Sequence, residues 1–164
     1  MRFVVRYRIN HYDIYNENKK MVSMIQMKVI FANCLDVYDE AGNRRYRVMR
    51  DCGKIVIKTA KGEKICCTLK YPVDESGRII QKGYARPPMA EKAVANTRLG
   101  ELVLCQTKRR DFFIYLNNRK VGELLDMLSI SKKILLSDEI PEAFCGLLFA
   151  VGYLTLHDDD VGIV

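Results

Sequence analysis

Histidine is scarce in this sequence, and the familiar catalytic signatures are missing from it. His11 and His157 are the only histidines among 164 residues. A histidine-based metal site would therefore need further ligands from scattered cysteines or carboxylates. No CxxC, HExxH, P-loop, glycine-rich dinucleotide loop or GxSxG elbow occurs. The sequence predicts no catalytic residue, no metal site and no cofactor, and it gives no support to an enzymatic reaction.

Long apolar runs are missing as well. A membrane-spanning helix needs about 20 consecutive apolar residues, whereas the prominent uncharged stretch here covers only residues 143–156. The N-terminus is apolar but reaches Arg6 and Arg8 too early for a secretory signal. We therefore expect a cytoplasmic protein, peripheral to a membrane if it meets one, without a transmembrane segment. Its length fits one domain over residues 1–164.

Charge is distributed unevenly along the chain. The net charge is +7, made up of +8 in residues 1–70, +5 in residues 71–122 and −6 in residues 123–164. The basic part could attract an anionic surface or a polyanion. It could equally serve only to keep a strand-rich protein soluble, and the sequence leaves both interpretations open.

The six cysteines are interpreted as free thiols. Their spacing is irregular, and Cys145 lies inside the uncharged stretch. Both features favour thiols in a reducing compartment over a disulfide framework. Adjacent Cys66 and Cys67 are expected to point to opposite faces of a strand.

A short unit of strand, polar turn and strand recurs along the chain. Residues 13–22, 36–46 and 113–122 each pass from β-branched or aromatic residues through Asn, Asp or Gly into a second apolar run, and residues 58–65 repeat the unit in degenerate form. This pattern is typical of β-hairpins. Further strands are predicted at residues 1–9, 55–59, 65–70, 79–84 and 102–107. Residues 124–136 fit either a helix or strands, and we favour a strand, a turn and a strand. Residues 90–95 could form a helical turn.

The stretch 143–156 predicts a helix that is apolar all the way round. Pro141 suits a first helical turn, with Ser137 or Asp138 as possible caps. A helix without a polar face must be enclosed on every side. Many short strands are expected to close into a barrel or a sandwich, because open edges invite association. A mostly β protein, a closed antiparallel barrel wrapped around its own C-terminal helix, satisfies both demands.

The repeated hairpins, especially residues 39–48 (DEAGNRRYRV), together with the apolar helix near the C-terminus, resemble the tubby C-terminal-like superfamily. This superfamily includes the tubby domain, the phospholipid scramblases and the LURP-one-related proteins, and the last group is the most similar. The resemblance implies a barrel of about twelve strands around a central helix. Tubby domains bind phosphoinositide headgroups, and scramblases are linked to lipid movement. LURP-one-related proteins have no agreed activity, and no family site is carried over to this chain.

Two basic clusters are the candidate anion-binding residues. If they meet on one face of the barrel, their guanidinium groups could hold phosphate in bidentate fashion. Otherwise they are solvated strand and turn residues. Nucleic acid is favoured less, because stacking aromatics are not interleaved with the charges. The first cluster is Arg44, Arg45, Arg47 and Arg50, and the second is Lys108, Arg109 and Arg110.

The sequence supports two hypotheses of function. The first is a non-enzymatic binding or scaffold protein whose basic clusters recognise anionic phospholipid headgroups, or whose surface recognises a protein partner. The alternative is a small-molecule-binding or hydrolytic protein with a pocket at the mouth of the barrel. The sequence does not indicate an oligomeric state.

Overall fold

The computed structural model describes residues 1–27, 33–51, 53–80 and 89–157. In this part of the chain, twelve antiparallel strands form a closed barrel in which each strand pairs with its neighbours in sequence and β12 pairs with β1. The strands are β1 (Arg2–Tyr7), β2 (His11–Asn16), β3 (Met21–Met27), β4 (Cys34–Asp39), β5 (Arg44–Asp51), β6 (Lys54–Thr59), β7 (Lys64–Lys70), β8 (Lys92–Thr97), β9 (Gly100–Gln106), β10 (Phe112–Leu116), β11 (Arg119–Leu125) and β12 (Ser131–Leu136).

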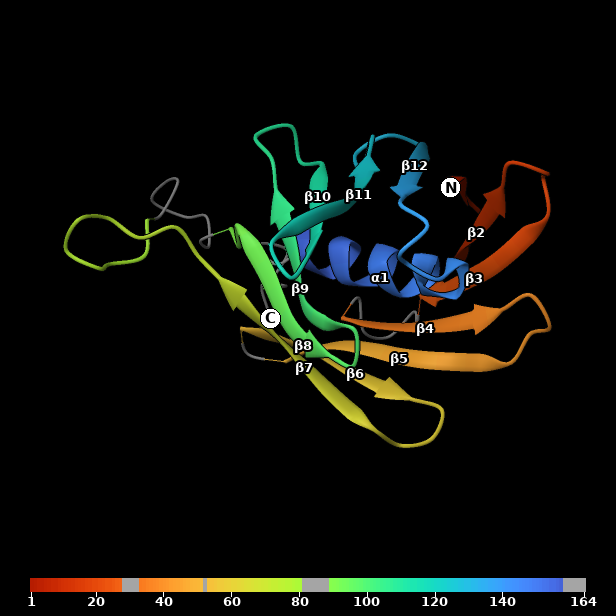
Figure 1. The fold of residues 1–164 in the computed structure, drawn as a ribbon, viewed down its shortest axis with the longest axis horizontal. Coiled ribbons are helices and arrows are strands. Elements are labelled where there is room, and N and C mark those ends of the chain that lie inside the picture. Colours follow the sequence, from red (N-terminus) through yellow and green to blue (C-terminus); the bar gives the residue numbers. More distant parts are fainter. Residues whose placement is uncertain (28–32, 52, 81–88, 158–164) are drawn as a thin grey trace.

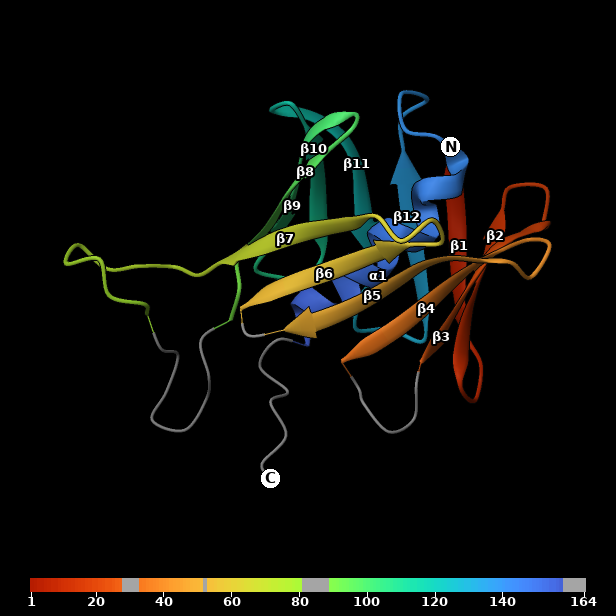
Figure 2. The same ribbon diagram turned by 90° about the horizontal axis from the view of Figure 1, so that it is seen from below.

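A helix fills the barrel. The described residues contain one α-helix, α1 (Cys145–Leu156), which follows the 3₁₀ turn η1 (Glu142–Phe144). Every residue of α1 except Tyr153 is buried. Figure 1 shows α1 with β10–β12 on one side and β4–β6 on the other, and Figure 2 shows it behind β5 and β6. The predicted enclosure of this helix is confirmed. Within the described ranges, no helix combines the length and the apolar character needed to cross a membrane.

Side chains alternate between the inside and the outside of the barrel along each strand. On β7, Cys67 and Leu69 are buried whereas Cys66 and Lys70 are exposed. The predicted opposition of Cys66 and Cys67 is therefore confirmed. The five cysteines within the described residues are free thiols, as expected.

Two local predictions are wrong. Residues 90–95 form no helical turn, because Ala93 and Ala95 are the inward-facing residues of β8, which pairs with both β7 and β9. These ladder hydrogen bonds outweigh the helix propensity of alanine, which is a weak preference. Ser137 and Asp138 do not cap the helix either. Pro141 stands at the start of η1, and no side chain donates or accepts a capping hydrogen bond there.

Two other predictions concern segments between strands. Residues 124–136 do contain a strand end, a turn and a second strand, since β11 ends at Leu125 and β12 starts at Ser131. In the predicted strand at residues 79–84, Ile79 forms only an isolated bridge with Val73. Residues 81–84 lie outside the described residues.

The helix is seated closely against β3 and β4. A Cβ atom added at Gly146 would lie 2.3 Å from Ser23 Oγ and 2.8 Å from Val37 Cγ1. Only a residue without a side chain allows the backbone of α1 to approach these strands so closely. This contact sets the position of α1 inside the barrel.

Candidate functional site

The structure separates the first predicted basic cluster. Strand β5 runs from the rim where α1 begins (the entry rim) to the rim where α1 ends (the exit rim). Arg44 and Arg45 start the strand near the entry rim, where Tyr46 lies 6.4 Å from Phe144. Arg50 lies at the other end of β5, six residues or about 20 Å further along the extended chain.

The second cluster lies at the exit rim. Lys108, Arg109 and Arg110 form the turn between β9 and β10, as predicted. Arg110 comes close to Arg50 at the end of α1. The structure therefore brings one residue from each cluster together and leaves Arg44 and Arg45 at the opposite rim.

Three arginines of the first cluster form ion pairs on the outside of the barrel. Arg47 binds Asp36 in bidentate fashion, with Nε donating to Oδ1 at 2.7 Å and Nη2 donating to Oδ2 at 2.9 Å. These hydrogen bonds raise the pKa of Arg47. Arg44 lies 4.0 Å from Asp36, and Arg45 lies 3.9 Å from Asp39. The two carboxylates neutralise much of the charge that the sequence placed in this cluster.

Arg50 and Arg110 hold the C-terminal end of α1. Arg50 Nη1 donates a hydrogen bond to the His157 carbonyl at 2.5 Å, and Arg110 Nη1 donates to the Leu156 carbonyl at 3.4 Å. The last carbonyl groups of a helix have no partner within it and carry partial negative charge. The two guanidinium groups supply both donors and positive charge. The contacts of Arg50 and Arg110 with these carbonyl groups therefore stabilise the fold.

Replacing Arg50 with Gln is expected to lower the free energy of unfolding by about 1–2 kcal/mol, because a charge-assisted hydrogen bond and a favourable interaction with the helix dipole are lost. Urea denaturation followed by circular dichroism measures the change. Arg109→Gln is the matched control, since Arg109 is exposed at the same rim and its side chain makes no hydrogen bond or ion pair within the described residues. Equal midpoints for the two variants would contradict this role of Arg50.

Outward-facing lysines on β6, β7 and β8 form a larger basic surface. The strand register places Arg47 opposite Lys58 and Lys58 opposite Lys64. It also places Lys70 opposite Lys92. All four lysines are exposed, and within the described ranges no carboxylate lies within ion-pair distance of any of them. We call these residues the cationic face: Arg47, Lys58, Lys64, Lys70 and Lys92.

Like charges directly opposite each other on neighbouring strands destabilise a sheet. The cationic face carries such a cost where Lys58 faces Lys64 across β6 and β7 and where Lys70 faces Lys92 across β7 and β8, and an external anion would relieve it. Sequence analysis missed these lysines, although one signal for them was available. Lys58 and Lys64 stand three residues to either side of Lys61, in the turn of this hairpin, so that a hairpin register centred on Lys61 pairs them.

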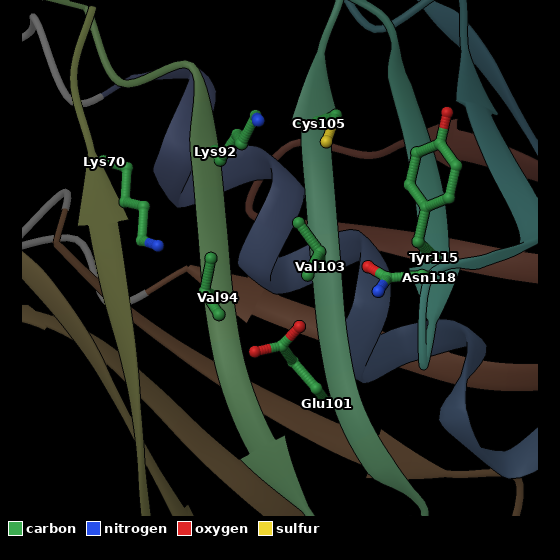
Figure 3. Close-up of a pocket in the computed structure, with 8 residues that line it drawn as sticks. All are labelled: Lys70, Lys92, Val94, Glu101, Val103, Cys105, Tyr115 and Asn118. Atoms are coloured by element: carbon green, nitrogen blue, oxygen red, sulfur yellow. The ribbon is translucent and has the colours of Figure 1, made fainter.

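A shallow groove of about 420 Å³ continues this face across β8, β9 and β10 (Figure 3). Val94 and Val103 pair at its floor, and Tyr115 stands beside them. Lys70 and Lys92 lie toward one end, whereas Glu101 lies at the other. The lysine end offers ammonium groups to an anion, and the floor offers an apolar surface next to a phenol.

Cys105 is also part of this groove, opposite Lys92 on the neighbouring strand. Burial raises the pKa of the Cys105 thiol, and the charge of Lys92 opposes that shift without cancelling it. The thiol is therefore protonated at neutral pH. Because the thiolate is the nucleophilic form, the groove is better suited to binding than to covalent chemistry.

A second, mainly apolar pocket of about 200 Å³ opens at the entry rim. It lies between the first turns of α1 and the inner face of β5–β10. Glu63 and Arg98 form an ion pair at its mouth. We call this the barrel-mouth pocket; its lining residues are Tyr46, Ile57, Thr59, Glu63, Ile65, Ala95, Thr97, Arg98, Leu99, Leu102, Leu116, Ile140, Phe144, Leu147, Leu148 and Val151.

Comparisons with known proteins concern the fold. No protein-family model and no curated protein matches this sequence. Among solved structures, the fold is similar to the X-ray structure of a protein from Arabidopsis thaliana, with a TM-score of 0.55 and 10% sequence identity. The alignment covers 97% of this chain and 90% of that one. Two sequences with few residues in common therefore reach the same arrangement over nearly their whole length.

Proposed function

We propose that the protein is a non-enzymatic binding protein that recognises anionic phospholipid headgroups through its cationic face. The observation that carries this proposal is the facing pair Lys58–Lys64 near one end of β7, together with the facing pair Lys70–Lys92 at its other end. Four exposed ammonium groups of this face lack a carboxylate partner within the described residues. The resemblance to the tubby C-terminal-like superfamily points to the same ligand class, since tubby domains bind phosphoinositides.

The chemistry of lysine suits a surface of many headgroups. Its ammonium is a compact, strongly hydrated charge on a flexible stem, so it needs no fixed partner geometry. Each basic residue close to an anionic membrane contributes about 1 kcal/mol. Salt screens exposed charges over about 10 Å at 0.1 M ionic strength. Binding through this face is therefore expected to be strong at low salt and weak at high salt.

The test is co-sedimentation with vesicles of phosphatidylcholine alone or with about 30% phosphatidylserine, an anionic lipid of the cytoplasmic leaflet, at low and high salt. We expect pelleting only with the anionic vesicles and only at low salt. Lys58→Glu/Lys64→Glu should weaken this binding at least 30-fold, because about 2 kcal/mol of attraction is lost and repulsion is added.

Lys19→Glu/Arg78→Glu is the matched control. It changes the net charge equally at two exposed positions outside the cationic face, and it should retain most of the binding. Equal pelleting with neutral and anionic vesicles would contradict the proposal. An equal loss in both double variants would contradict the assignment to this face, because net charge alone would then explain the binding.

A second candidate function, the binding of a small molecule, is favoured by the barrel-mouth pocket. Its lining contains apolar side chains and a few polar groups at the mouth, which is the usual composition of a ligand site. Serine, cysteine and histidine do not occur among the lining residues. The pocket therefore supports binding, and its lining lacks the Ser–His or Cys–His pair that the hydrolytic version of this hypothesis would most simply use.

A further inference from the structure

We infer that the barrel-mouth pocket binds a small carboxylate with an apolar body, whose carboxylate takes the place of Glu63 beside Arg98. This inference rests on the second candidate function, and it names the ligand class. It is independent of the cationic face, which lies on the outside of the barrel.

The position of α1 explains why the pocket exists. An α-helix with its side chains is about 10–12 Å wide, and a barrel of twelve strands encloses more space than one helix fills. Gly146 holds α1 against Ser23 and Val37, on β3 and β4. The unfilled space is left on the side of β6–β10, where Ala95 contributes only a methyl group to the wall.

The pocket has the size and the surface for a hydrocarbon group. Leu102, Leu147, Leu148 and Val151 line its interior beside Ala95. An engineered apolar cavity of about 150 Å³ in another protein binds benzene. The present volume of about 200 Å³ is sufficient for one ring or a chain of about six to eight carbons. Water gains few hydrogen bonds from such walls, so an apolar group is the favoured occupant.

The mouth supplies the complementary charge. Glu63, in the turn between β6 and β7, forms an ion pair with Arg98, in the turn between β8 and β9. The side chains are 45% and 85% exposed. Exposed ion pairs of this kind contribute little to stability. A ligand carboxylate can therefore replace that of Glu63 at small cost, while its apolar body enters the pocket. Leu99 lines the same mouth although it is 42% exposed, and it is placed to cover the ligand.

The test uses octanoate, 1-octanol and acetate as probes, with calorimetric titration and thermal unfolding of the full chain. Octanoate should bind and raise the melting temperature, 1-octanol should bind more weakly, and acetate should do neither. Arg98→Gln should weaken octanoate binding about fivefold and leave 1-octanol binding unchanged. Arg78→Gln, which removes an exposed arginine far from the mouth, should bind octanoate like the wild type.

A variant whose pocket is filled by a larger side chain is the second part of the test. Ala95→Leu should fold and abolish binding of both octanoate and 1-octanol, because the added side chain occupies the space beside α1. If Ala95→Leu does not fold, Leu116→Phe fills the same pocket from β10 and should have the same effect. Absence of octanoate binding by the wild type, or undiminished binding by a folded filled variant, would overturn the inference.

The two proposals fail separately. Lys58→Glu/Lys64→Glu should bind octanoate like the wild type, and Ala95→Leu should sediment with anionic vesicles like the wild type. Loss of octanoate binding in Lys58→Glu/Lys64→Glu would assign the carboxylate to the cationic face and overturn the pocket inference. Loss of vesicle binding alone would contradict only the headgroup proposal.

Discussion

Leu148→Asp is expected to unfold the protein. Leu148 is 1% exposed and is the fourth residue of α1, inside the barrel. Removing a buried leucine side chain costs about 2–5 kcal/mol. Burying an unpaired carboxylate adds several kcal/mol more, even if the group becomes protonated. Because the whole stability of a domain is about 5–15 kcal/mol, the sum is enough to abolish the folded state.

Circular dichroism and the dispersion of amide NMR signals would show this loss directly. Leu148→Met is the matched control, because its volume is similar and such swaps usually cost less than about 1.5 kcal/mol. A soluble Leu148→Asp variant with an unchanged melting temperature would mean that this position is not enclosed by the barrel.

Gly146→Ala is expected to lower the free energy of unfolding by about 2 kcal/mol, the second largest change among these predictions. The new Cβ would lie 2.3 Å from Ser23 Oγ and 2.8 Å from Val37 Cγ1. The shifts of side chain and backbone that accommodate such overpacking cost about 1–3 kcal/mol. Displacing Ser23 also endangers the hydrogen bond that its Oγ donates to the Tyr38 carbonyl at 2.8 Å, which is worth about 1 kcal/mol. The higher helix propensity of alanine relative to glycine offsets up to about 1 kcal/mol of this loss.

Gly152→Ala is the internal comparison for this prediction. Its added Cβ would meet Leu124 Cδ1 at 2.4 Å, and this atom is the far end of a flexible side chain that can rotate away. We therefore expect a smaller loss at Gly152 than at Gly146, measured by urea denaturation under the same conditions. If Gly146→Ala were as stable as the wild type, α1 would not be seated against β3 and β4 as described.

Much of the fold could be predicted because its pieces are local. Hairpin turns are marked by Asn, Asp and Gly between strand-forming residues, and such a turn is recognisable within about ten residues. The helix was recognisable because residues 143–156 are apolar in every direction, which only enclosure explains. The sequence failed at residues 90–95, where pairing with two neighbouring strands, a non-local effect, determines the structure.

The candidate site was predicted less well, for a reason that strand geometry makes clear. Arg45, Arg47 and Arg50 are close in sequence, but successive side chains of a strand point to opposite faces. Arg50 therefore shares the inward parity of Val48 and reaches the end of α1. The two-residue alternation of strand side chains therefore already indicated that Arg50 faces inward, whereas Arg45 and Arg47 face outward. The rows of the cationic face needed the register between strands, which a single hairpin specifies only in part.

The barrel-mouth pocket could not be located from sequence at all. Its volume depends on where α1 sits within the barrel, and thus on a contact between Gly146 and strands more than 100 residues earlier in the chain. If α1 lay at the centre of the barrel, the same side chains would leave thinner gaps between the helix and the wall on both sides. The pocket is therefore a property of the assembled barrel and not of any motif.

Hydrogen exchange of the α1 backbone amides, with and without anionic vesicles, tests the central claim most directly, because the account places this helix inside the barrel and the charges outside. Amides of residues 149–156 should belong to the slowest class, exchanging only through global unfolding. Their rates should stay the same when the vesicles bind. Fast exchange of these amides in buffer, or a change in their protection on vesicle binding, would contradict a helix that the barrel encloses and keeps from the ligand.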